Sequence, residues 1–176
     1  MLADYDAKGV AEVMGIAFHR ETMPTGTARQ KFTVHIHISS GALKRSWKGL
    51  STPSALLIEQ AVEHGLPRQA LRHLAGFLAG DDKTKIPQIE RVVVPKTTLE
   101  RRSEQLSPHE SERTERIARL FVHARRALGT EAEAREFMTT SHPRLDGRSP
   151  MEAAKTDLGT RRVEQLLNAL EYGLAL

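Results

Sequence analysis

The chain has 176 residues and a formal net charge of +4, and hydrophobic and charged residues make up 39% and 27% of it. This composition is typical of a globular protein with one domain or two small domains, and with 5% aromatic residues the core must be mainly aliphatic. The absence of cysteine excludes disulfides and zinc sites with thiolate ligands, and no apolar run is long enough to cross a bilayer. The acidic start MLADYDAKG does not resemble a signal peptide, so we expect a cytoplasmic protein.

The first fifty residues differ in pattern from the rest of the chain. A short helix is expected over residues 7–14, with Val10, Val13 and Met14 on one side. Residues 32–38 alternate apolar and polar side chains, which is typical of a half-buried strand. A strand needs a pairing partner, and the sequence does not identify one. We therefore expect residues 1–50 to form an N-terminal extension with a short strand, serving as a dimerisation arm, an extra DNA contact or a packed extension.

The pattern from residue 52 onward is helical. Thr52-Pro53 and Pro67 are typical helix starts, and Gly65 and Gly80 are typical helix ends. Two short helices are expected near residues 85–91 and 95–104. The fold class predicted from this pattern is mainly α.

Three capping boxes are predicted in the second half of the chain. Ser107, Thr130 and Ser149 are each followed three residues later by Glu, so each hydroxyl is expected to cap the start of a helix rather than act in catalysis. The last helix is expected from about Thr160, with an apolar stripe of Val163, Leu166, Leu167, Leu170 and Leu174. Beyond this stripe, Tyr172 and Leu176 leave apolar side chains that need a cover, either the same domain or a partner.

The net positive charge is concentrated in residues 83–102, which contain six basic and two acidic residues. Two short helices with a tight connection near Val92–Val94, packed through Ile86, Ile89 and Leu99, follow the pattern of a helix-turn-helix. The second helix would place these residues outward, toward DNA: Lys96, Thr97, Thr98, Arg101 and Arg102. The alternative is a charged face exposed to solvent.

No motif of a known catalytic or metal site is present. His35 and His37 share one face of the expected strand, but a metal site needs further ligands, and none is evident nearby. The sequence has no G-x-S-x-G elbow, no phosphate-binding glycine loop and no H-E-x-x-H motif. We therefore expect no enzymatic activity, no metal site and no cofactor. A metal-dependent enzyme that uses the two histidines is the least favoured alternative.

Residues 52–176 resemble the Xre/MbcA/ParS type of bacterial antitoxin. The resemblance is most specific in the C-terminal part, in Gly147-Arg148-Ser149-Pro150, in Leu158-Gly159 followed by Arg161, Val163 and Leu166-Leu167, and in Leu170-Glu171-Tyr172-Gly173. The stretches LERRSEQLSPHESER and GTEAEAREFM are also similar to this family.

The resemblance implies an antitoxin of a type II toxin–antitoxin system. Its partner would be a RES-domain toxin that consumes NAD. Residues 51–106 would form an Xre-like helix-turn-helix region that binds operator DNA and represses the operon, and residues 107–176 would form the helical toxin-binding domain. A homodimer would assemble with the toxin into a larger hetero-oligomer, without membrane attachment.

The last helix would cover the entrance to the active site of the toxin. The toxin-binding residues expected on this basis are Arg148, Arg161, Arg162, Glu164, Leu167, Leu170, Glu171, Tyr172, Gly173, Leu174 and Leu176. The main alternative function is a stand-alone helix-turn-helix transcriptional regulator whose C-terminal domain serves only in dimerisation.

Overall fold

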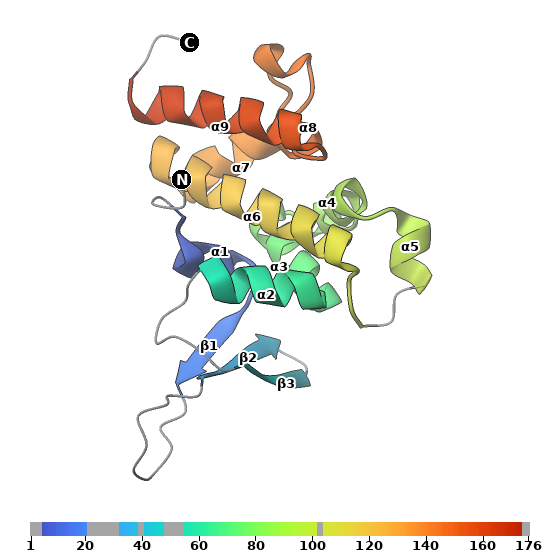
Figure 1. The fold of residues 1–176 in the computed structure, drawn as a ribbon. Helices are drawn as coiled ribbons and strands as arrows, with labels where there is room; N and C mark the ends of the chain where they lie inside the picture. Colours follow the sequence, from blue (N-terminus) through green and yellow to red (C-terminus); the bar gives the residue numbers. More distant parts are fainter. Residues whose placement is uncertain (1–4, 21–31, 39–40, 48–54, 102–103, 174–176) are drawn as a thin grey trace.

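The computed structural model describes residues 5–20, 32–38, 41–47, 55–101 and 104–173, and its fold is mainly α, as the sequence predicts (Figure 1). The α-helices in the described ranges are α1 (Ala7–Val13), α2 (Ala55–His64), α3 (Arg68–Ala79), α4 (Ile86–Val93), α5 (Lys96–Arg101), α6 (Pro108–Leu128), α7 (Glu131–Thr139), α8 (Pro150–Ala153) and α9 (Asp157–Glu171). Short 3-10 helices span Lys83–Lys85 and Pro143–Leu145.

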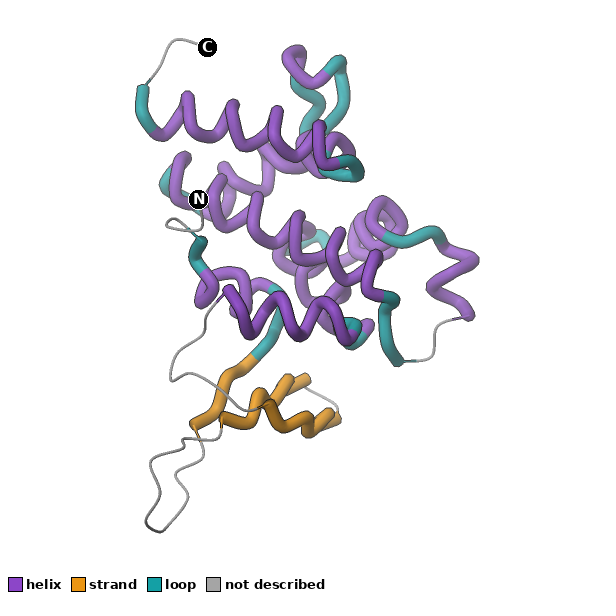
Figure 2. Tube along the Cα trace, viewed as in Figure 1, coloured by secondary structure: helices purple, strands orange, loops and turns teal. Residues whose placement is uncertain are grey.

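Three strands, coloured orange in Figure 2, pair antiparallel in the order β1-β2-β3. They are β1 (Ala17–Arg20), β2 (Phe32–Ile38) and β3 (Gly41–Trp47). The strand predicted over residues 32–38 is thus confirmed, and β1 and β3 are the pairing partners that the sequence did not reveal.

Helix α6 lies at the centre of the helical body. It contacts α1, α2, α7 and α9, and Figure 1 shows it running beside α9 in the same direction. Ile117, Leu120 and Phe121 of α6 are fully buried, together with Leu74 of α3 and Leu167 of α9. The buried apolar residues form one continuous cluster from Ala7 to Leu167. The division at residues 106 and 107 into two domains therefore stays a prediction.

The helix ends follow local capping chemistry. Ser107 and Ser149 form complete capping boxes with Glu110 and Glu152. At Thr130 the hydroxyl accepts from the backbone N–H of Glu133 and donates to the carboxylate of the same residue, so the predicted box is only half formed.

Two further predicted helix starts have different outcomes. The last helix begins at Asp157 with Thr156 as its cap, three residues before the predicted start. The predicted start at Thr52-Pro53 lies outside the described residues.

Candidate functional site

Three acidic residues of α9, spaced seven residues apart, lie along the flank that faces α6. The first two are Asp157 and Glu164. Arg116 Nη2 lies 2.6 Å from Asp157 Oδ1, and Arg119 Nη1 donates to Glu164 Oε1 at 2.7 Å. Arg116 is buried and also contacts Glu112, so it joins α6 to the start of α9 from inside the molecule.

The third acidic residue, Glu171, ends α9 and has two partners on α6, an arginine and a histidine. Arg126 Nε lies 2.7 Å from Glu171 Oε1, and His123 Nε2 lies 3.1 Å from Oε2. The hydrogen bond from Arg126 is the main reason that the pKa of Glu171 lies below its usual value. Burial is the main reason that the pKa of His123 is lowered.

The attachment of α9 rests mainly on its apolar face. Val163, Leu166 and Leu167 are buried, and each buried aliphatic side chain contributes about 1.5–3 kcal/mol. A partly exposed ion pair contributes only about 0–1 kcal/mol. The ion pairs along α6 therefore fix the rotation of α9 about its axis more than they supply its stability.

The other flank of α9 is held by the loop that precedes α8. Arg162 Nη1 donates to Asp146 Oδ2 at 2.6 Å, and its Nη2 donates to the backbone carbonyl of Arg144. Arg148 Nη2 lies 3.2 Å from the same Asp146 oxygen. The hydrogen bond from Arg162 is the main cause of the lowered pKa of Asp146. Asp146 has a positive φ of 59°, a left-handed conformation that aspartate adopts more readily than most residues.

The predicted toxin-binding residues therefore fall into different environments. Leu167 is fully buried and Leu170 is partly buried against the core, so these two support α9 from beneath. Arg162, Glu164 and Glu171 are engaged in the ion pairs described above. Arg148, Arg161, Tyr172 and Gly173 are exposed, and Leu174 and Leu176 lie outside the described residues. Whether each of them contacts a partner stays a prediction.

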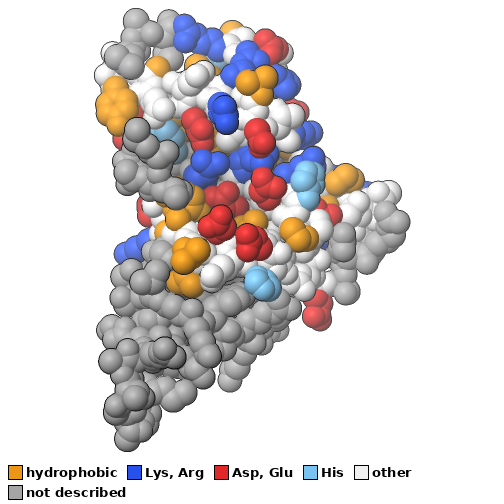
Figure 3. Space-filling model, viewed as in Figure 1, with side chains coloured by type: hydrophobic (Ala, Val, Ile, Leu, Met, Phe, Trp, Pro, Cys, Tyr) orange, Lys and Arg blue, Asp and Glu red, His pale blue; other side chains and the backbone are white. Residues whose placement is uncertain are grey.

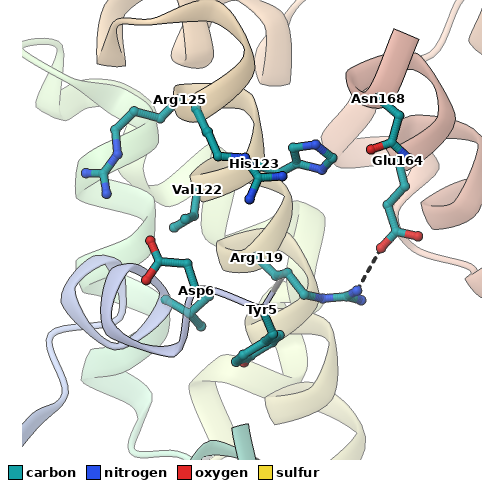
Figure 4. A pocket seen from close by; sticks show the side chains of 10 residues that line it. Tyr5, Asp6, Arg119, Val122, His123, Arg125, Glu164 and Asn168 are labelled. Atoms are coloured by element: carbon teal, nitrogen blue, oxygen red, sulfur yellow. Dashed lines mark hydrogen bonds and ion pairs between the residues drawn. The ribbon is translucent and has the colours of Figure 1, made fainter. Parts of the chain in front are cut away.

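A pocket of about 570 Å³ lies between α1, α6 and α9 (Figure 4). It is lined by Tyr5, Asp6, Val10, Arg119, Val122, His123, Arg125, Arg126, Glu164 and Asn168. Arg119 and Arg126 are paired with Glu164 and Glu171, and Arg125 lies 3.6 Å from Glu131 and 3.7 Å from Glu12. The lining cations are therefore already balanced by carboxylates, and the pocket does not favour an anionic ligand.

One wall of this pocket is anchored by a hydrogen bond between the N-terminal segment and α6. Tyr5 Oη donates to Glu115 Oε1 at 2.8 Å, and Arg119 lies 3.6 Å from the same carboxylate oxygen. Burial is the largest cause that raises the pKa of both Tyr5 and Glu115. The contact joins the segment before α1 to the centre of α6.

The predicted DNA-binding residues lie on or directly after α5. Lys96 and Thr97 are exposed, Thr98 is partly exposed, and Leu99 is buried as the helix-turn-helix pattern requires. Arg101 ends α5, and Arg102 lies outside the described residues. DNA contact by these residues stays a prediction.

The connection between α4 and α5, which contains no glycine, packs inward. Val93 and Val94 are buried, at the end of α4 and directly after it. Ile89 of α4 and Leu99 of α5 are buried too, as expected, whereas Ile86 is only partly buried against the core.

The described ranges contain no group of three or more His, Asp or Glu that could hold a metal ion. His35 and His37 lie on β2, opposite Lys44 and Ala42 of β3 in the backbone register. Within the same ranges no helix combines the length and apolar character that crossing a membrane requires. On the face shown in Figure 3, acidic and basic side chains are interspersed over the helical body.

Comparison with known proteins gives one family match. Residues 123–173, from the second half of α6 to the end of α9, match the family model described as the antitoxin Xre/MbcA/ParS C-terminal toxin-binding domain. No curated protein matches the chain. The matched range contains all of α9 and its contacts with Arg126, His123 and Asp146, whereas Arg116 and Arg119 of α6 lie before it.

Proposed function

We propose that the chain is an antitoxin that neutralises a RES-domain toxin that consumes NAD, because residues 123–173 match the toxin-binding domain model of Xre/MbcA/ParS-type antitoxins. The observation that carries the proposal is the family match over residues that form one well-packed unit. In this unit α9 is fixed on its two flanks by the ion pairs of Glu171 with Arg126 and of Arg162 with Asp146, and on its inner face by buried leucines. A helix fixed in this way is preorganised for binding, which lowers the entropic cost of association.

Neutralisation is proposed to occur by covering the active-site entrance of the toxin with the end of α9. Tyr172 and Gly173 are exposed there, directly before Leu174 and Leu176. Arg148 and Arg161 would form part of the polar rim. Arg162, Glu164, Leu167, Leu170 and Glu171 would act by holding the helix in position.

Operator binding is proposed for α5 and the residues that follow it. The support is the concentration of basic residues in positions 83–102, the exposure of Lys96 and Thr97, and the inward anchor Leu99. Operator binding would repress the operon. A homodimer in the cytoplasm that joins the toxin in a larger assembly, with no cofactor, completes the proposal.

The alternative is a stand-alone transcriptional regulator in which the matched domain only dimerises. Co-expression with the adjacent reading frame, followed by purification through a tag on one partner, separates the two. Recovery of both proteins in fixed ratio and protection of growth support the antitoxin. A regulator that binds its operator but leaves the adjacent product unbound overturns it.

The role of the tail is tested by deleting residues 171–176. The truncated protein should fold and bind operator DNA but fail to protect cells from the toxin. A circular-dichroism melt of the truncated protein is needed beside the growth assay, because Glu171 also pairs with α6. Full protection by a folded truncation would refute the proposed covering of the active site.

The DNA contact is tested by the double substitution Arg101→Ala with Arg102→Ala. Operator affinity should fall, and the log–log salt slope should flatten by about one unit for each phosphate that the variant no longer neutralises. Lys8→Ala, at an exposed cation on α1, is the control and should leave both unchanged. Unaltered operator affinity in the double variant would place the recognition helix elsewhere.

A further inference from the structure

The outward face of α9 forms one continuous stripe. Its members are Leu158, Arg161, Gln165, Asn168 and Tyr172, and all five are exposed. Their spacing of three and four residues places them on a single side of an α-helix. Val163, Leu166 and Leu167 face the core from the opposite side.

Polar residues of α9 divide sharply between this stripe and the two flanks. On the flanks, Arg162, Glu164 and Glu171 are each engaged with another element of the chain. On the stripe, the side chains of Arg161, Gln165 and Asn168 form no hydrogen bond or ion pair with any described residue. The polar side chains of the stripe are therefore exposed to solvent and accessible to a partner.

A large apolar side chain lies at each end of the stripe. Leu158 is 73% exposed and Tyr172 is 66% exposed, and they are two of the three large exposed apolar residues in the described part of the chain. The third, Leu56 on α2, is 48% exposed and lies outside the matched segment. Along the axis, Leu158 and Tyr172 are separated by fourteen residues, or about 21 Å.

We propose that this stripe is the surface of α9 that docks into a groove of the toxin. Leu158 and Tyr172 are its two apolar anchors, and Arg161, Gln165 and Asn168 bind polar groups between them. The inference rests on the proposed function and deepens it. It extends the toxin contact from the tail to the full length of α9 and adds Leu158, Gln165 and Asn168 to the interface.

The toxin is the occupant because the stripe lies wholly within the segment that matches a toxin-binding domain. The stripe is also continuous with the proposed tail contact at Tyr172, so one partner can cover both. Insertion of one helix face into a groove, with anchors three or four residues apart or at multiples of this spacing, is a common mode of recognition. Two apolar anchors around a polar centre are consistent with the concentration of binding energy in a few residues.

The test compares Leu158→Glu with Leu56→Glu in the full chain, using toxin from the adjacent reading frame. Both residues are exposed on helices, so both variants should melt as the wild type does. Leu158→Glu should weaken toxin binding at least about tenfold by calorimetry, and Leu56→Glu should leave it unchanged. Leu158→Ala should give a smaller loss in the same direction.

The other outcomes contradict either the docking stripe or the proposed function. If the wild type binds the toxin and Leu158→Glu binds equally well, the docking stripe is wrong while the antitoxin function stands. If the wild type does not bind the toxin at all, the proposed function fails and the stripe fails with it. If Leu158→Glu alone halves the mass of the isolated protein in light scattering, the stripe is an interface between two copies of this chain, which also overturns the proposal.

Discussion

Gly159 lies against the backbone carbonyl of Ala153 so closely that a Cβ on Gly159 would overlap with this oxygen. Helix α8 ends at Ala153 and α9 begins at Asp157, so the first turn of α9 passes over the end of α8. The close approach leaves no space for any side chain at position 159.

Gly159→Ala is expected to destabilise the fold by about 1–3 kcal/mol, the usual cost of overpacking. Gly76→Ala is the matched control, because Gly76 lies inside α3 and a methyl group at this position would meet nothing within 4 Å. The control should stabilise the protein by about 0.5–1 kcal/mol, since alanine is the better helix former. Urea unfolding of both variants measures the difference, and equal effects would contradict the close approach at Gly159.

Tyr5→Phe is expected to lower the free energy of unfolding by about 1–3 kcal/mol. The substitution removes the hydrogen bond that Tyr5 donates to the carboxylate of Glu115, and losses of this size are typical for a hydrogen bond to a charged group. Tyr172→Phe, at an exposed position, is the control and should be close to neutral. Thermal or urea unfolding that does not distinguish the two would refute the anchoring role of Tyr5.

The lowered pKa of His123 predicts that the stability of the fold depends on pH. Burial lowers its pKa below 6.5 in the folded protein, although the hydrogen bond to Glu171 acts in the opposite direction. As the pH falls through about 6.5, the unfolded state takes up the proton before the folded state does, so stability decreases. His123→Gln should make the urea midpoint less dependent on pH between about 7.5 and 5.5. A wild-type midpoint that rises as the pH falls over this interval would show that Glu171 and Glu164 dominate instead.

The capping serines are expected to be structural. Ser107→Ala and Ser149→Ala should each cost about 1 kcal/mol, because each removes the acceptor for a backbone N–H in the first turn of its helix. Thr130→Ala should fall in the same range, since its hydroxyl accepts from the backbone N–H of Glu133. Thermal melts without any loss of stability in the three variants would disprove these assignments.

Most helix boundaries could be predicted because they depend on neighbouring residues. Ser107 begins α6 through local hydrogen bonds, and Gly129 ends it through a left-handed turn. Both signals can be recognised in the sequence. The predicted start of α9 lies three residues too late because its local signal is incomplete. Thr156 caps this helix, but Gly159 rather than Glu stands three residues later, so no capping box signals the start.

The candidate site depends on contacts between distant residues, which a local sequence pattern cannot predict. Arg119 and Glu164 are 45 residues apart in the chain, and only the packing of α6 against α9 brings them together. The sequence identifies Glu164 and Glu171 as charged residues of the last helix and therefore as binding candidates. Leu158 stands out in the sequence only as part of the family pattern, because its exposure depends on how α9 is rotated.

The matched segment begins at His123, in the last two turns of α6, whereas the helix itself begins at Pro108. A recombinant protein joined at residue 123 to an antitoxin of the matched family would exchange only the end of α6 and separate Arg116 and Arg119 from their partners on α9. A joint at Ser107 keeps α6 and its ion pairs with α9 intact. The transferable module for engineering hybrid proteins is therefore larger than the family boundary indicates, and it includes the whole of α6.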